Sequence, residues 1–187
     1  MNLTTDHDLM IAVRGGDIEK LGLLFERYHK QLYNFFLFGT KNRQVSEDLV
    51  QDIFLRILKY RHTYRDKANF MTWMYKIARN ARNDYFREHS DRYEQPVEDY
   101  DLVSSDPNPE EKCERDDEIN ILHKALAKLP EDKQEVIIMS RFNNIRYEEI
   151  GKILGCKTGT VKVRVYRAMR ELTKIYSKLT SERSYEM

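Results

Sequence analysis

Basic side chains are concentrated in the stretch GCKTGTVKVRVYRAMREL, residues 155–172. Between Lys157 and Lys178 there are seven basic residues and one acidic residue, a net charge of +6. Lysines and arginines at this density can neutralise phosphate groups and release their counterions, which is the chemistry of nucleic-acid binding. A solvated basic surface would have the same composition, so the interpretation depends on the secondary structure of the stretch.

Two periodicities conflict in this stretch. Residues 161–166 alternate apolar and polar side chains, as in a half-buried strand. Residues 167–172 are strong helix formers, and the chain has no other strand pattern with which a strand here could pair. We therefore predict a helix. Its apolar side chains fall on one stripe: Val161, Val165, Ala168, Met169 and Leu172.

Gly155 and Thr158 indicate where this helix begins. Gly155 follows the segment YEEIGKIL, at a position where a helix end needs a residue that tolerates positive φ. Thr158 can then cap the next helix. Two helices joined by such a turn form a helix-turn-helix, whose second helix can enter the major groove of DNA. This context favours nucleic-acid binding over a solvated basic face.

A second basic cluster lies between Arg56 and Arg87, with nine basic and two acidic residues, a net charge of +7. Aromatic side chains are interleaved with these charges. Single-stranded nucleic acid requires this combination, because cations follow its backbone and rings stack on its exposed bases. Any one aromatic side chain here is more often part of a core, and for Trp73 we favour core packing over base stacking.

The helix predicted at residues 47–60 has an apolar side that can fill a core and an outer side that is polar except for one leucine. The outer side carries Asp48, Gln51, Asp52, Leu55 and Lys59. An apolar anchor with a polar rim is typical of a docking surface. A solvated face explains the same residues equally well.

Catalytic and metal-binding patterns are absent from the sequence. The histidines at positions 7, 29, 62, 89 and 123 are scattered, and there is no H-E-x-x-H, P-loop or G-x-S-x-G motif. We therefore expect no enzymatic activity, no cofactor and no metal. Cys113 and Cys156 lie outside any C-x-x-C pair, and we expect two reduced cysteines.

Targeting and membrane segments are not predicted either. The N-terminus has acidic residues early and no long apolar run, so it does not resemble a signal peptide. No window approaches the ~18 consecutive apolar residues of a membrane span. We expect a cytoplasmic, soluble protein without membrane insertion.

The elements that must position these residues are helices. Thr5 begins a capping box and Gly15-Gly16 ends a short first helix. Asp17 is predicted to cap the second helix and Ser46 the third. A loop at residues 61–68 leads to the remaining predicted helical segments: about 70–89, 119–129, 131–142, 147–154 and 158–178.

Residues 91–118 separate the two halves of the chain. They hold 12 acidic and 3 basic residues, a net charge of −9, and three of the four prolines. The absence of any sustained period predicts an extended, flexible linker. We therefore predict an all-α fold of two small helical domains, residues 5–90 and 119–178, joined by this acidic linker.

Two parts of the sequence resemble a known family. The segments SEDLVQDIFLRIL and FMTWMYKIARNARNDYFR are similar to region 2 of bacterial sigma factors, and LPEDKQEVIIMSRFNNIRYEEIGKILGCKTGTVKVRVYRAMREL is similar to their region 4. The chain resembles extracytoplasmic-function (ECF) sigma factors, which keep only these two regions. The resemblance covers roughly residues 5–90 and 119–175. It implies a transcription initiation factor whose partners are core RNA polymerase, promoter DNA and an anti-sigma protein.

The resemblance also implies three sets of contact residues. The clamp-helix coiled coil of the polymerase is expected to contact Asp48, Gln51, Asp52 and Leu55. The melted −10 element, with a flipped base, is expected to contact Tyr64, Arg65, Lys67, Asn69, Phe70, Arg79, Asn80 and Asn83. The duplex −35 element is expected to contact Thr160, Lys162, Val163, Arg164, Tyr166 and Arg167. Relatives commonly have a small polar residue in place of Val163, so we expect an apolar contact there, for example with a thymine methyl group.

An ordinary helix-turn-helix regulator with an N-terminal dimerisation or sensor domain is the main alternative. It explains the C-terminal half but leaves the basic and aromatic segment 56–87 without a role. A regulator of this kind binds duplex DNA alone, whereas a sigma factor needs core polymerase to open a promoter. A purely structural helical protein gives no reason for positive charge in both domains and its exclusion from the linker.

Overall fold

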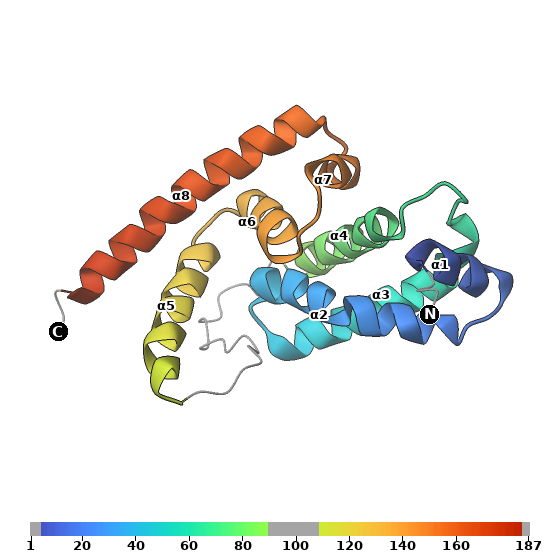
Figure 1. Ribbon diagram of the computed structural model, residues 1–187, viewed down its shortest axis with the longest axis horizontal. Coiled ribbons are helices and arrows are strands. Elements are labelled where there is room, and N and C mark those ends of the chain that lie inside the picture. Colours follow the sequence, from blue (N-terminus) through green and yellow to red (C-terminus); the bar gives the residue numbers. More distant parts are fainter. Residues whose placement is uncertain (1–4, 90–108, 185–187) are drawn as a thin grey trace.

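The computed structural model of the protein describes residues 5–89 and 109–184, and every regular element in these two ranges is a helix. Helices α1–α4 form one bundle, α5–α8 form a second, and the two bundles are in contact (Figure 1). The prediction of an all-α fold with two helical units is therefore confirmed. Across the two described ranges, no helix combines the length and the apolar character that a membrane span requires.

The first bundle contains α1 (Asp6–Gly15), α2 (Lys20–Thr40), α3 (Arg43–Tyr60), the 3-10 turn η1 (Arg61–Thr63) and α4 (Phe70–Glu88). Helix α2 packs against α1 and α3, and α3 packs against α4. The stripes predicted from the sequence fill this core because apolar side chains at helical spacing share one face. Its most buried members include Leu24, Leu32, Phe35, Phe36, Ile53, Ile57, Met74 and Ala78.

The ends of these helices agree only in part with the predicted caps. Thr5 and Asp8 form the expected capping box, and Gly16 ends α1 with a φ of 109°. Two predicted caps are wrong. Helix α2 begins at Lys20 after a turn, so Asp17 is not its cap. Helix α3 is capped by Asn42, and Ser46 is buried inside the helix, where its Oγ donates to the Asn42 carbonyl at 2.6 Å.

The second bundle contains α5 (Pro109–Ala127), α6 (Glu131–Ile137), the π-helical turn η3 (Ile138–Phe142), α7 (Tyr147–Leu154) and α8 (Thr158–Ser184). The long helix α8 packs against α5, α6 and α7, and it runs along one side of the molecule (Figure 1). The apolar stripe predicted for residues 161–172 faces these helices. Val161, Val165, Ala168 and Leu172 are buried, which confirms the helix over the alternative strand.

Helix α5 begins inside the predicted linker of residues 91–118. Its first residue is Pro109, and proline is favoured at the first helical position. The C-terminal part of the predicted linker is therefore helical. Its remaining part falls within residues 90–108, which lie outside the described residues.

The two bundles meet along α2 and α4. Helix α4 packs against α7, and α2 packs against α5, α6 and η3 (Figure 1). Phe38 of α2 contributes aromatic contacts to Phe142 and His123, with ring centroids 5.1 and 5.9 Å apart. Other side-chain contacts across this boundary include the ion pairs of Arg79 and Arg82 with Glu135 and the hydrogen bond from Asn143 to Tyr75.

Candidate nucleic-acid and docking surfaces

The turn between α7 and α8 depends on two glycines. Gly155 ends α7 with a φ of 66°, as the sequence predicted. Gly151, inside α7, lies against the turn, and a Cβ atom there would stand 2.7 Å from the Cys156 carbonyl oxygen. The backbone amide of Cys156 donates to the Gly151 carbonyl at 2.9 Å. The close approach that sets the angle between the two helices therefore requires glycine at position 151.

The solvent-facing side of α8 carries all six side chains predicted to read duplex DNA. Helix α8 begins at Thr158, because the Lys157 carbonyl accepts from the Val161 amide at 3.2 Å. Thr158 is therefore the first helical residue and not the cap that the sequence predicted. Tyr166 is 63% exposed and Val163 is 47% exposed. The exposed set, which we call the α8 face, is Thr160, Lys162, Val163, Arg164, Tyr166 and Arg167.

The loop between η1 and α4 is fixed from inside by Tyr64. Its hydroxyl donates to the Ala68 carbonyl at 2.8 Å and therefore accepts from Nδ1 of His7 at 3.0 Å. Burial, with the nearby charge of Asp6, raises the pKa of Tyr64 to about 12, so the hydroxyl remains a donor at neutral pH. Nη1 of Arg14 donates to the Tyr64 carbonyl at 2.7 Å.

Helix α1 therefore supports the loop, a role that the sequence did not suggest. Besides the Tyr64 carbonyl, Arg14 contacts Asp66, with Nη2 and Oδ1 2.6 Å apart. Arg14 and Tyr64 are 50 positions apart in the chain. No local pattern marks such a contact, so sequence reasoning could not have found Arg14 or His7.

The structure presents only part of the predicted −10 set to solvent. Tyr64 and Phe70 are 1% and 2% exposed, so these two side chains are not available to DNA and instead support the loop. Their rings pack with Trp73, which is half-buried, as core packing of that residue predicted. The exposed members are Arg65, Lys67, Asn69, Asn80 and Asn83. Oδ1 of Asn69 already caps α4 by accepting from the Thr72 amide at 2.9 Å.

Arg79 and Arg82 on α4 have acidic partners in the second bundle. Oε1 of Glu135 in α6 accepts from Nε of Arg79 at 3.2 Å and from Nη2 of Arg82 at 3.0 Å. Arg82 belongs to the basic cluster of residues 56–87, but it is only 5% exposed. Its guanidinium lies over the Phe35 ring of α2, 5.0 Å from the centroid, and pairs with Glu135 of α6. Glu135 is 4% exposed. Buried charges of this kind are tolerated only when they are paired and hydrogen-bonded.

Two further contacts join the bundles nearby. Nδ2 of Asn143 donates to the Tyr75 hydroxyl at 2.7 Å, and burial raises the pKa of Tyr75. The Thr72 hydroxyl donates to Glu149, which also accepts from Nζ of Lys152 at 2.8 Å. Burial raises the pKa of Glu149, but these hydrogen bonds and the nearby positive charges outweigh it and leave that pKa lowered. Glu149 is therefore ionised at neutral pH.

The outer face of α3 presents the predicted docking residues together. Leu55 is 65% exposed, and Asp48 and Gln51 are also exposed. Asp52 is half-buried and accepts from Nε of Arg56 at 2.6 Å, so its carboxylate is held in place. An exposed leucine beside carboxylates has the composition of an interface anchor with a polar rim.

A groove between α3 and α4 adjoins this face, with a volume of about 510 Å³. Four of its lining residues are acidic and one is an arginine, so its surroundings are electronegative. The charged members are Asp48, Asp52, Arg56, Asp84 and Glu88. Complementary charge steers association, so this side of the first bundle suits a basic partner.

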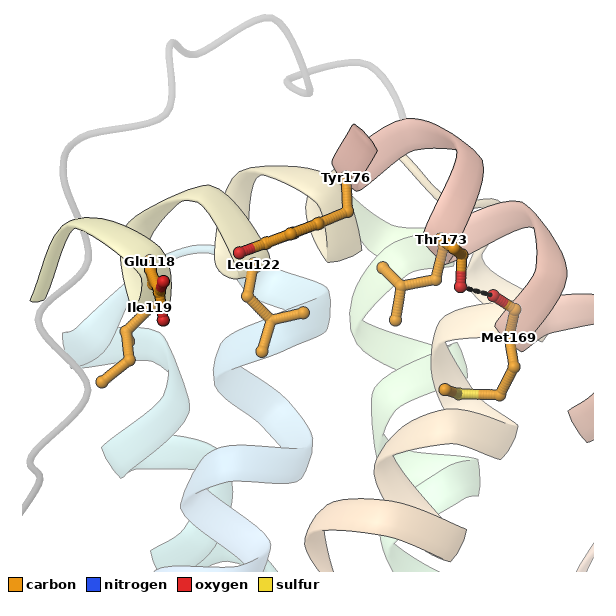
Figure 2. A pocket seen from close by; sticks show the side chains of 7 residues that line it. Glu118, Ile119, Leu122, Met169, Thr173 and Tyr176 are labelled. Carbon is orange, nitrogen blue, oxygen red and sulfur yellow. Dashed lines mark hydrogen bonds between the residues drawn. The ribbon is translucent and has the colours of Figure 1, made fainter. Parts of the chain in front are cut away.

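A second depression, of about 340 Å³, lies between α5 and α8 (Figure 2). Its lining is mostly apolar, with side chains such as Leu122, Met169 and Leu172. It has no converging set of acid, base and nucleophile of the kind that an enzyme site needs. Within residues 5–89 and 109–184, no cluster of three or more His, Cys, Asp or Glu side chains could hold a metal ion.

Two family models match the sequence. Residues 24–92 match Sigma-70 region 2, and residues 119–172 match Sigma-70, region 4. The chain is 27% identical over 169 residues to the ECF RNA polymerase sigma factor SigX of Bacillus subtilis, covering 88% of this chain and 87% of the relative. It is 28% identical over 175 residues to the ECF RNA polymerase sigma-E factor of Escherichia coli, covering 88% and 90%.

Solved structures share the fold. The sigma factor RpoE from Bartonella quintana, solved with the anti-sigma factor NepR, superposes with a TM-score of 0.65 at 24% identity, covering 83% of this chain and 96% of that one. CnrH, solved with the cytosolic domain of CnrY, superposes with a TM-score of 0.70 at 19% identity, covering 92% and 97%. Both likenesses extend over both helical bundles.

Proposed function

Because the chain belongs to the ECF group of bacterial sigma factors, which direct RNA polymerase to promoters and are not enzymes, we propose which surface of this protein performs each step of initiation. The observation that supports the proposal most is that three exposed surfaces lie on different elements: the outer face of α3, the α8 face, and the loop before α4 together with the exposed side of α4. The outer face of α3 is acidic with an apolar anchor. The α8 face and the loop with α4 are basic, and each belongs to the bundle that matches the corresponding sigma region.

The α8 face is proposed to read the duplex −35 element. An exposed helix of this width enters the major groove, where arginine and lysine bind guanine and apolar groups contact the thymine methyl. Arg164 and Arg167 supply the first kind of contact and Val163 the second. Thr160, in the first turn, is proposed to contact a phosphate, because helix N-termini bind anions.

The loop of residues 64–69 and the exposed side of α4 are proposed to hold the melted −10 strand. Arg65 and Lys67 can follow its phosphates, and the amides of Asn80 and Asn83 can bond the edge of a flipped base. Tyr64 and Phe70 are assigned a supporting role because they are buried. Arg79 is partly exposed on the same helix, and its Nε donates to Glu135 at 3.2 Å.

The outer face of α3 is proposed to bind core polymerase. Leu55 is the apolar anchor, and Asp48, Gln51 and Asp52 form the polar rim that meets a basic partner. We also propose that an anti-sigma protein binds this chain, because the sigma factor RpoE from Bartonella quintana was solved in complex with the anti-sigma factor NepR. The proposed place of action is the cytoplasm, where bacterial polymerase works.

The test is transcription in vitro with purified core polymerase on a promoter library, with the start sites sequenced. A sigma factor should give promoter-specific transcripts that core polymerase alone does not give. If the protein binds a duplex operator tightly but neither binds core polymerase nor directs initiation, it is an ordinary regulator and the proposal is wrong.

A further inference from the structure

We infer that Tyr60, at the C-terminal end of α3, is the aromatic platform on which an unpaired base of the melted promoter strand stacks. Tyr60 lies outside the set of residues proposed above to contact the −10 strand. The inference rests on the proposed function of the loop and of α4. It follows from three observations on Tyr60: the exposure of its ring, its position beside α4, and the positive charge around it.

Few aromatic rings of the first bundle are available to a base. Tyr64 and Phe70 are 1% and 2% exposed, and Trp73 is half-buried with its ring packed against both of them. Tyr60 is 41% exposed, and no other aromatic side chain within residues 5–89 is exposed. Bases of single-stranded nucleic acid stack on exposed rings. Tyr60 is therefore the ring of this bundle that is best placed to receive a base.

The packing of α3 against α4 places Tyr60 near the surface proposed to hold the melted strand. The two helices run in opposite directions (Figure 1), and Nη1 of Arg56 lies 3.5 Å from Oδ2 of Asp84. Tyr60 is one turn after Arg56 on α3, and Asn80 is one turn before Asp84 on α4. Tyr60 and Asn80 therefore lie at the same level of the bundle, and both are exposed. A base stacked on the ring can present its edge to the Asn80 amide.

The charge around the ring suits a nucleic-acid backbone. Nζ of Lys59 lies 5.5 Å from the centroid of the Tyr60 ring. From Lys59 to Lys67 there are four basic residues and one acidic residue, a net charge of +3. The acidic residue, Asp66, is paired with Arg14. Cations beside a stacking ring can follow the phosphates on either side of the stacked base.

Core polymerase is the other occupant to consider, because the proposed docking face is on the same helix. Tyr60 is one turn after Arg56, whose guanidinium reaches α4, so it lies on the side of α3 that faces α4. Leu55, the proposed anchor for polymerase, is on the outer side and is 65% exposed. This difference favours the DNA strand as the partner of Tyr60. Loss of polymerase binding is therefore one of the outcomes that the experiment must detect.

The experiment uses holoenzyme assembled from the full-length protein and core polymerase, on a promoter that the wild-type protein transcribes. Tyr60→Phe keeps the ring, and Tyr60→Leu keeps an apolar side chain without the ring. The matched control is Leu23→Ala, because Leu23 is an exposed apolar residue of α2 in the same bundle. Three quantities are measured: affinity for core polymerase, formation of the closed complex, and lifetime of the open complex after a competitor is added.

Tyr60→Leu should shorten the lifetime of the open complex about fivefold or more, the change expected when one base loses its stacking partner. Its affinity for core polymerase and its closed complex should be those of wild type. Tyr60→Phe should retain the long lifetime because it retains the ring, and Leu23→Ala should change none of the three quantities. A wild-type lifetime in folded Tyr60→Leu protein would overturn the inference. So would a loss of core affinity large enough to explain a shorter lifetime.

A measurement on the wild-type protein covers the case in which Tyr60→Leu does not fold. Iodouracil is placed at successive positions of the non-template strand, where ultraviolet light cross-links it to an aromatic side chain in contact with it. A cross-link between one of these positions and Tyr60 is expected, and its absence at every position would contradict the inference. If wild-type holoenzyme initiates but Tyr60 fails these tests, only this inference is wrong. If wild-type holoenzyme does not initiate, the proposed function fails and the inference fails with it.

Discussion

At the scale of single residues, the two basic clusters differ in what surrounds them. Side chains of the α8 face are open to solvent and can meet an undistorted duplex directly. The loop before α4 is instead held from below by buried rings and by α1. A loop braced in this way suits a flipped base, because the pocket must exist before the base arrives.

Substitution of Arg167 should impair duplex binding alone. Arg167→Ala should cost about 1–3 kcal/mol in closed-complex formation if the guanidinium makes a bidentate base contact. Asn80→Ala should leave closed binding nearly intact and impair melting. Transcription from a duplex template is compared with that from a pre-opened bubble, which should restore activity to Asn80→Ala only. Lys178→Ala, with the same loss of charge on the same helix, is the control for Arg167. Equal rescue of both variants by the bubble would contradict this division.

Substitution of Arg14 should weaken promoter melting although Arg14 is not expected to touch DNA. Arg14→Ala removes the donor to the Tyr64 carbonyl, a charged hydrogen bond worth about 1.5–3 kcal/mol when buried and less here, where Arg14 is partly exposed. Arg14→Lys can restore one of the two contacts but not both. Its open-complex formation should therefore lie between that of wild type and that of Arg14→Ala. Open-complex formation followed with a fluorescent base near −10 checks this order. Lys20→Ala, an exposed control, should resemble wild type, and equal activity of all three variants would exclude a positioning role.

At the scale of elements, each surface depends on one junction or face. The angle between α7 and α8 depends on the contact of Gly151 with the turn, whereas Gly159 in the first turn of α8 has open space around it. On α3, the docking side chains lie off the apolar stripe, so they can be changed without disturbing the core.

Alanine at the two glycines should have opposite effects on stability. Gly151→Ala places a Cβ atom against the Cys156 carbonyl and should destabilise the second bundle by about 1–3 kcal/mol and weaken duplex binding. Gly159→Ala should stabilise α8 by about 0.5–1 kcal/mol, because alanine is a better helix former than glycine. Thermal unfolding by circular dichroism measures both. A melting temperature for Gly151→Ala at or above that of wild type would show that the turn adapts.

Charge reversal on α3 should weaken binding to core polymerase. In the double variant Asp48→Lys with Asp52→Lys, the face would present like charges to a basic partner. The lost pair between Asp52 and Arg56 is partly exposed and should cost at most about 1 kcal/mol of stability. Affinity for core polymerase is measured by fluorescence titration. The control reverses the exposed acids Asp17 and Glu19 in the same bundle. Unchanged core affinity in the folded α3 variant would reject this docking face.

At the scale of the whole molecule, the arrangement of the two bundles exposes the α8 face and partly covers α4. The free protein therefore presents the α8 face, which we propose to read duplex DNA, while Arg79 remains paired with Glu135. This order matches initiation, in which a closed duplex is bound before strands separate.

Binding to polymerase and a promoter should move the bundles apart. Donor and acceptor dyes at the exposed positions Lys76 of α4 and Glu148 of α7, introduced without using the native cysteines, should transfer energy efficiently in the free protein. Transfer should be nearly lost in the promoter complex, where the two elements are roughly 85 Å apart. A pair at Lys59 and Lys76, within one bundle, should not change. Persistent transfer between the bundles in an active complex would show that they initiate without separating.

The sequence alone was sufficient for the features that local patterns encode. The period of the apolar side chains identified the helices, the glycine after α7 identified the turn, and clustered charge identified both basic surfaces. These inferences succeed because helical periodicity and positive φ involve residues that are close in the chain. The caps at Asp17, Ser46 and Thr158 failed because the helices begin at other residues: α2 starts without a side-chain cap, α3 is capped by Asn42, and Thr158 is already helical.

Only the tertiary structure decided which of those side chains are free to act. Arg82 is a basic residue on α4, and it is buried because it packs on Phe35 of α2 and pairs with Glu135, 53 positions away in the chain. Tyr64 and Phe70 lie in the loop segment that was predicted to contact DNA, but their side chains are buried in the core. Burial depends on elements that meet from distant parts of the chain, and no local period contains that information.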